Sequence, residues 1–316
     1  MKIFAPEYYN SFKCIADKCK NSCCIGWDIE IDSNMLDVYL NMKDSFGEKL
    51  KANIITNEEV SSFKLDQKKR CPFLKENGLC EIILEKGEDY LCGICSDHPR
   101  FRNFFSDREE IGLGLCCEEA SRIILTSEVT SDLQMISENS EEEYELEDIE
   151  VYVLNLRNKL FGIVSDKDKD YNKCRFELSE TIEREVPVFT SDDIKNAYLD
   201  LEMLDNSWGS LLKGFCEYKC HMPSLCNEYS DYAKRLLSYF IFRHFADTIL
   251  DGRIYERVVF SILSTEIIIG ISDYLSDGKI EIETICDIAR RYSSEIEYSD
   301  ENIEKILDYI AKKSTE

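Results

Sequence analysis

The sequence predicts a mainly α-helical protein, with a cysteine-rich α+β region that has short strands and packs on a helical C-terminal domain. Residues 231–250 and 253–275 are largely apolar over the length of long helices, which is typical of buried helices. Residues 280–292 and 301–312 carry apolar residues at helical spacing. The third observation is that the cysteines are concentrated in the N-terminal part of the chain, where ten of the 15 lie before residue 120.

A length of 316 residues favours two domains or one large one. From Ser131 to Glu150 there are nine acidic residues and no basic one, so the boundary is placed there. We therefore expect a cysteine-rich region at 1–128, an acidic connector at 129–150 and a helical domain at 151–316. A cofactor or substrate cleft is expected between the first and last of these.

The first region should begin with an aromatic lead-in and contain three local elements. Apolar and acidic residues alternate from Trp27 to Asp32, which predicts a short strand. Ser33 is placed to cap a helix over 34–50. Residues 71–82 read as a hairpin, because the Asn77-Gly78 pair favours a tight turn.

Further helices are predicted downstream. One follows the cysteine pair at 116–117 and reaches about Leu125, and another covers 151–165. A third is expected over 191–205, with Ser191 as its cap and acidic residues in its first turn.

Composition excludes several classes of protein. A formal net charge of −25 argues against nucleic acid and would attract a basic, lysine-bearing protein surface. No stretch of about 18 residues lacks charge, and the first residues lack a signal peptide, so we expect no membrane span and a cytoplasmic protein. A disulfide framework is not expected in that compartment.

The cysteines of the first region are predicted to hold a metal centre. Cys14, Cys19, Cys23 and Cys24 fall within eleven residues, and thiolates this close need a soft cation. The other thiols of this region are Cys71, Cys80, Cys92, Cys95, Cys116 and Cys117. With only three histidines in the chain, zinc and an iron–sulfur cluster both remain open. The alternative is a set of buried free cysteines that pack as small hydrophobes.

Several other polar residues have competing interpretations. There is no G-x-G-x-x-G segment and no P-loop, so a Rossmann-type transferase is not supported. Arg100, in the His98-Pro99-Arg100 segment, either lines a functional site or forms ion pairs with acidic residues on the surface. Arg243 and His244 lie on a predicted buried helix and need an acid such as Glu266.

Two further groups have a simple structural interpretation. Tyr292, Glu295 and Glu297 would ordinarily be surface residues. A second, sparser thiol group is more typical of buried cysteines than of a metal site; its members are Cys216, Cys220 and Cys226.

As a set, these motifs resemble the flagellin lysine-N-methylase family, often called FliB. The N-terminal part of the resemblance is Cys14-x4-Cys19-x3-Cys23-Cys24 with Trp27, then Cys71-Pro-Phe-Leu, Gly78-Leu-Cys80, Cys95 before Pro99-Arg100, and Leu115-x-Cys117-x-Glu119-Ala120. The C-terminal part is Tyr239-Phe-x-Phe-Arg243 and Tyr292-Ser-x-Glu295-Ile-Glu297 with Asn302. The chain departs from the family pattern at Glu118, which replaces a usual proline, and at Tyr298, which replaces a usual histidine.

The resemblance implies a [4Fe-4S] protein that methylates the ε-amino group of flagellin lysines with S-adenosylmethionine. The thiols in matching positions are Cys14, Cys19, Cys23, Cys24, Cys71, Cys80, Cys95 and Cys117, whereas Cys92 and Cys116 fall outside the pattern. Zinc stays open as the alternative metal.

Methyl transfer needs a neutral lysine amine, so a carboxylate or tyrosine must accept its proton. We look for this role among Tyr292, Glu295 and Glu297, with Arg243 and Arg100 holding the cofactor. The competing hypothesis is a zinc- or cluster-stapled interaction module without catalytic activity, and a weaker one is an electron-transfer protein.

Overall fold

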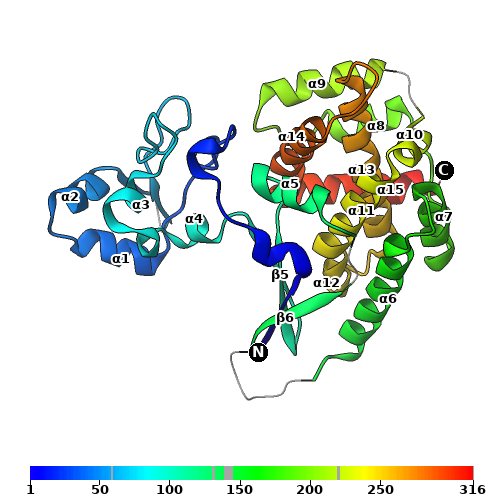
Figure 1. Cartoon of the computed structure of the whole chain (residues 1–316), viewed down its shortest axis with the longest axis horizontal. Coiled ribbons are helices and arrows are strands. Elements are labelled where there is room, and N and C mark those ends of the chain that lie inside the picture. The colour runs from blue at the N-terminus through cyan, green and yellow to red at the C-terminus, as the bar shows by residue number, and fades with distance from the viewer. Residues whose placement is uncertain (58–59, 130–131, 139–144, 219–220, 316) are drawn as a thin grey trace. The chain divides into compact units, whose positions relative to one another are not determined.

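The chain divides into two compact units. The computed structural model describes residues 1–57, 60–129, 132–138, 145–218 and 221–315. One unit is Lys13–Arg100, and the other combines Met1–Phe12 with residues 101–316 (Figure 1). The division therefore lies at residues 12 and 100, rather than at the predicted connector 129–150, because the N-terminus joins a sheet of the larger unit.

That sheet is small and mixed. Its strands lie in the order β4, β5, β1, β6, with β1 parallel to β5 and antiparallel to β6. The strands are β1 (Lys2–Pro6), β4 (Arg100–Phe104), β5 (Arg108–Leu113) and β6 (Leu133–Glu138). β6 falls within the predicted connector, where most of its side chains are exposed. It was not predicted because its backbone pairs with β1 without an alternating apolar face.

The larger unit is mostly helical, which confirms the predicted mainly α fold. Its helices are α5 (Glu118–Thr126), α6 (Asp148–Ser165), α7 (Tyr171–Thr181), α8 (Ser191–Tyr198), α9 (Asn206–Glu217), α10 (Met222–Glu228), α11 (Ser230–His244), α12 (Thr248–Asp251), α13 (Ile254–Tyr274), α14 (Ile282–Tyr292) and α15 (Asp300–Lys313). Short 3₁₀ turns occupy Glu7–Ser11 and Phe245–Asp247. In the part of the chain that is described, no helix combines the length and apolarity needed to cross a membrane.

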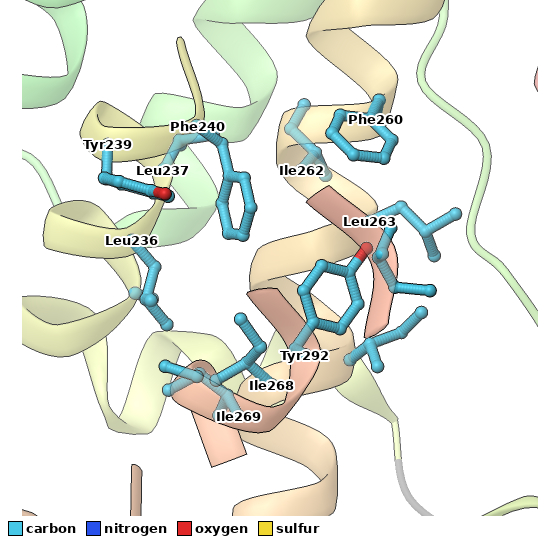
Figure 2. Packing of buried hydrophobic residues seen from close by; sticks show 14 of the residues in the cluster. Leu236, Leu237, Tyr239, Phe240, Phe260, Ile262, Leu263, Ile268, Ile269 and Tyr292 are labelled. Carbon is cyan, nitrogen blue, oxygen red and sulfur yellow. The ribbon is translucent and has the colours of Figure 1, made fainter. Parts of the chain in front are cut away.

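Helix α13 is the centre of this unit. It is buried without interruption from Val258 to Ser272 and packs against α9, α10, α11, α14 and α15 (Figure 1). Figure 2 shows the ring of Tyr292 among Phe240, Leu263 and Ile268 in this core. The predicted buried helix over 253–275 is therefore confirmed, since every face of an apolar helix must be covered.

The smaller unit has a separate core. Its elements are α1 (Ser33–Asn41), α2 (Ser45–Ala52), β2 (Ile54–Asn57), β3 (Val60–Phe63), α3 (Glu81–Lys86) and α4 (Gly93–Asp97), with 3₁₀ turns at Ala16–Lys18 and Glu88–Tyr90. The core is aromatic: the ring of Phe63 lies 6.0 Å from that of Tyr39 and 5.0 Å from that of Phe73. Such pairs add to apolar burial in a small core.

The local predictions for this unit were partly wrong. The helix expected over 34–50 is two helices, because the Asp44 carboxylate accepts from Gly47 N and starts a new helix. Asp32, rather than Ser33, caps the first of them. The strand predicted at 27–32 is reduced to a single bridge between Glu30 and Ser62.

The hairpin predicted at 71–82 is also smaller than expected. Leu74 and Cys80 form an isolated bridge across a turn in which Gly78 has φ +80°. Helix α3 begins immediately after Cys80. The turn is thus present, but it leads into a helix instead of a second strand.

Candidate functional site

A π-helical turn, Ser293–Glu297 (η5), joins α14 to α15 and buries polar side chains. Glu295 and Glu297 are each 5% exposed, and Ile296 between them is 1% exposed. The turn is enclosed by the start of α9, which donates to Glu295, and by α11, whose His244 contacts Glu297. Tyr292, Glu295 and Glu297 are therefore buried, and the expectation that they are surface residues was wrong.

The carboxylate of Glu297 contacts three polar side chains of α11. The hydroxyl of Tyr239 lies 3.0 Å from both of its carboxylate oxygens, and His244 Nε2 lies 2.7 Å from Oε1. Arg243 Nε lies 3.3 Å from the same oxygen, and Arg243 Nη1 donates to the Tyr239 hydroxyl at 2.9 Å. We call these residues, together with Tyr298, the Glu297 cluster.

The Glu297 cluster has a defined charge state. Burial raises the pKa of Glu297, but the charge of Arg243 and the contact with His244 outweigh it, so the pKa lies below its ordinary value. Burial lowers the pKa of His244 more than Glu297 raises it. At neutral pH the cluster therefore contains an ionised carboxylate, a charged guanidinium and a neutral imidazole.

Tyr298 is the exposed end of this cluster. It is 52% exposed, whereas Glu297, Tyr239 and His244 are buried. The guanidinium of Arg243 lies 5.0 Å from the centroid of its ring. Its hydroxyl accepts from the Cys116 thiol at 3.0 Å, and burial raises the pKa of that thiol to about 12, which keeps it protonated.

The ion pair predicted between Arg243 or His244 and Glu266 is wrong. Glu266 is fully buried on α13 and accepts from Arg175 Nε at 3.0 Å and from the Tyr171 hydroxyl at 3.1 Å. The sequence correctly predicted that Arg243 pairs with an acid. That acid is Glu297, because the turn that carries it faces α11.

The other predicted catalytic residues lie outside the Glu297 cluster. Glu295 accepts the backbone N–H groups of Leu204 and Asp205 at 2.7 and 3.0 Å. The Tyr292 hydroxyl lies 2.7 Å from Ser264 Oγ and 3.0 Å from the Tyr198 hydroxyl, in the core. The signature's Asn302 donates to the carbonyl of Glu295 at 2.9 Å.

Replacing Tyr292 with phenylalanine should reduce the free energy of unfolding by about 1–2 kcal/mol, because buried hydroxyl partners lose a hydrogen bond. Urea unfolding of the variant, compared with Tyr152→Phe, measures this. Tyr152 is 54% exposed, so its variant should match the parent chain. Equal stability of all three proteins would contradict a structural role for the Tyr292 hydroxyl.

The thiols of the smaller unit gather around its core. Cys71 and Cys92 are buried members of that core, and Cys24, Cys80 and Cys95 pack against it. Cys71 N donates to Cys24 O at 2.8 Å, and Cys95 N donates to Cys92 O at 2.9 Å. Cys92 lies outside the family pattern but inside this group, whereas Cys14 and Cys23 are exposed. We call Cys24, Cys71, Cys80, Cys92 and Cys95 the core thiols.

Neighbouring thiols and burial shift the pKa values of different core thiols in opposite directions. The thiol of Cys23 hydrogen bonds to Cys24 and lowers the pKa of Cys24 to about 7. Burial, with smaller contributions from the neighbouring thiols Cys24, Cys80 and Cys92, raises the pKa of Cys71 to about 12. Among the described residues, however, there is no group of three or more His, Cys, Asp or Glu side chains whose positions would allow them to hold a metal ion.

The remaining predicted residues belong to different units. Cys117, matched by the family pattern, precedes α5 in the larger unit, and Cys19 is half-buried in the smaller one. Arg100 Nη1 lies 3.3 Å from Ser96 O and 3.4 Å from Asp97 O, at the end of α4. Of the sparser thiol group, Cys216 and Cys226 are buried as expected, and Cys220 lies outside the described residues.

His98 should make the smaller unit sensitive to acid. Its ring stacks on that of Trp27 at 6.4 Å, and burial lowers its pKa to about 4. Between its ordinary pKa of about 6.5 and that value, the unfolded chain binds a proton that the folded chain does not, so stability falls as pH falls, by up to about 1.4 kcal/mol per pH unit.

The variant His98→Gln should lose this dependence. The measurement is urea unfolding followed by tryptophan fluorescence at pH 7 and pH 5, since Trp27 contacts His98. The same pH dependence in parent and variant would contradict the assignment.

Comparison with known proteins identifies the relatives of this chain. Residues 101–316 match the family described as the FliB lysine N-methylase C-terminal domain. The flagellar biosynthetic protein FliU of Salmonella muenchen is 30% identical over 126 residues, which are 38% of this chain and 75% of that protein. The lysine-N-methylases of Salmonella typhimurium and Salmonella choleraesuis are each 29% identical over 126 residues, 38% of this chain and 31% of theirs. No solved structure matches.

The chain therefore spans only about a third of those lysine-N-methylases. The family match covers more than half of the chain and includes every residue of the Glu297 cluster. The resemblance seen in the sequence motifs is confirmed: this chain belongs to the FliB lysine N-methylase C-terminal domain family.

Proposed function

We propose that this protein is a lysine N-methyltransferase that acts on flagellin, uses S-adenosylmethionine and carries a [4Fe-4S] cluster. The observation that carries the proposal is the family match over residues 101–316. The printed names of the relatives, a flagellar biosynthetic protein and two lysine-N-methylases, support both the reaction and the class of substrate.

The Glu297 cluster supports a role in orienting the lysine amine. Tyr298 is half-exposed, and in this proposal its hydroxyl is the polar group through which an incoming ammonium would meet the cluster. Behind it, Arg243 is fixed by Glu297 and Tyr239, so the ring of Tyr298 lies on a rigid support. In this proposal Tyr298 accepts a hydrogen bond from the amine, and Glu297 holds the supporting charges.

Tyr292 and Glu295 take positioning roles in the same proposal. Glu295 ties the π turn to the start of α9, and Tyr292 ties the end of α14 to α13. Together they fix the backbone from which Glu297 projects.

The core thiols fit the cluster by their chemistry. All are sulfur donors, which select iron–sulfur centres or zinc, and they come from separate segments around one apolar core. We propose that the four ligands of the iron–sulfur cluster are among the core thiols and include Cys71.

The test is anaerobic purification of the full chain, with counts of iron, sulfide and zinc and a mass-spectrometric assay of methyl transfer to flagellin lysines. About four irons per chain and methylated lysine would support the proposal. One zinc, no iron and no methyl transfer would support the non-catalytic interaction module instead.

A further inference from the structure

A concave surface on the larger unit lies where the end of α5 meets the start of α11. Its volume is about 620 Å³, and its walls include Thr126, Glu228, Tyr229, Asp231, Tyr232 and Arg235. This volume lies within the range of roughly 300–1,000 Å³ that is typical of small-molecule sites.

Arg235 supplies a fixed positive charge in this wall. Its Nε donates to the carbonyl of Ser127 at 2.6 Å, and its guanidinium carbon lies 5.9 Å from the ring centroid of Tyr232. A guanidinium held in this way is preorganised to bind a carboxylate.

The other walls supply negative charge and aromatic faces. Glu228 and Asp231 are exposed carboxylates that would accept from ribose hydroxyls or from an ammonium. Tyr229 and Tyr232 are half-buried, and the Tyr229 hydroxyl accepts from Ile280 N at 3.2 Å, which fixes its ring. Such rings stack on a purine or face a sulfonium.

We propose that this concavity binds S-adenosylmethionine or a ligand of its class, a purine nucleoside joined to a cationic amino acid. The proposal rests on the proposed function and gives its cofactor a location. Arg235 would repel a lysine ammonium, and the two carboxylates would repel a purely anionic ligand. The mixed charges therefore favour a zwitterion that presents its carboxylate to Arg235.

The position of Arg235 connects this surface to the Glu297 cluster. Arg235, Tyr239 and Arg243 recur at every fourth residue of α11 and so lie on one face. Arg235 is about 12 Å along the helix axis from Arg243. Arg235 and Tyr239 also share the wall of a smaller cavity of about 20 Å³. In this arrangement Arg235, rather than the predicted Arg243 or Arg100, holds the cofactor.

Calorimetric titration of the full chain with S-adenosylhomocysteine tests the proposal. Arg235→Ala should weaken binding about 10-fold or more, because a charged hydrogen-bonding partner of the carboxylate is lost. Glu228→Gln combined with Asp231→Asn should also weaken it. Arg184→Ala is the matched control, since Arg184 likewise lies over a ring, that of Tyr255, and contacts a backbone carbonyl; its binding should be unchanged.

The outcomes separate this proposal from the proposed function. Binding within twofold of the parent chain in both pocket variants would overturn the site, and methyl transfer by the parent chain would then leave the function standing. If the parent chain shows no binding and no methyl transfer, both the site and the proposed function are overturned. If circular dichroism shows that Arg235→Ala fails to fold, the titration of the variant with both exposed carboxylates replaced decides the test. Arg235→Lys then serves as the conservative substitution at the arginine.

Discussion

Replacing Glu297 with glutamine should lower the free energy of unfolding of the larger unit by about 3 kcal/mol or more and abolish methyl transfer. Glu297 is the ionised partner of Arg243, whose side chain is only 9% exposed, and its replacement leaves that guanidinium without a compensating charge. Tyr239 and His244 also lose a charged acceptor, because glutamine offers one neutral acceptor oxygen in place of two carboxylate oxygens. Urea unfolding followed by circular dichroism measures the stability, and mass spectrometry of flagellin measures the activity.

The matched control for this variant is Glu301→Gln. Glu301 is also in the C-terminal segment, but its pair with Lys305 is largely exposed, so its variant should unfold at the same urea concentration as the parent chain. Equal stability of the Glu297 variant and the control would show that Glu297 does not hold the cluster together.

The Glu297→Gln variant should respond to acid differently from the parent chain. Because the folded-state pKa of Glu297 is depressed, its contribution to stability is present above the ordinary carboxyl pKa of about 4.3 and is lost as pH falls through the lower folded-state value. The glutamine variant lacks this loss, so the stability gap between parent and variant should narrow below about pH 4.

Replacing Cys71 with serine should remove the metal from the protein and unfold the smaller unit. Cys71 is 7% exposed, bonds through its backbone to Cys24 and belongs to the core of the unit. In the proposed centre, metal binding and folding of this unit are coupled, so loss of one ligand removes both. Iron and sulfide should fall from about four each per chain to near none. Limited proteolysis should then cleave within residues 13–100.

Two cysteine variants control for this effect. Cys14→Ser removes an exposed thiol of the family pattern, and Cys216→Ser removes a buried thiol of the larger unit. Both should keep their iron. A Cys71 variant that retains full iron, or a Cys14 variant that loses it, would contradict the proposed set of ligands.

Several features of the fold could be predicted because they depend on local composition. The apolar run from Val258 to Ser272 predicts a helix covered on all sides, and α13 is such a helix. The helices α6, α14 and α15 likewise follow from their apolar spacing. The density of thiols before residue 120 predicts that sulfur atoms gather in the N-terminal region, and five of these thiols belong to the core of the smaller unit or pack against it.

Other features depend on pairings between distant segments. The N-terminal strand β1 joins β5 and β6 through backbone hydrogen bonds, which leave no mark in the side-chain pattern. The single break in the helix predicted over 34–50 depends on the side chain of Asp44, an acid that could equally have been solvated.

The sequence by itself determined the membership of the family, the helical class and the set of polar residues available to a site. Only the tertiary structure decided that Glu297 rather than Glu266 meets Arg243, that Tyr292 lies in the core, and that Cys92 joins the core thiols. The reason is physical: residue type and spacing set which side chains can interact, but a π turn and the facing of helices set which of them are buried together.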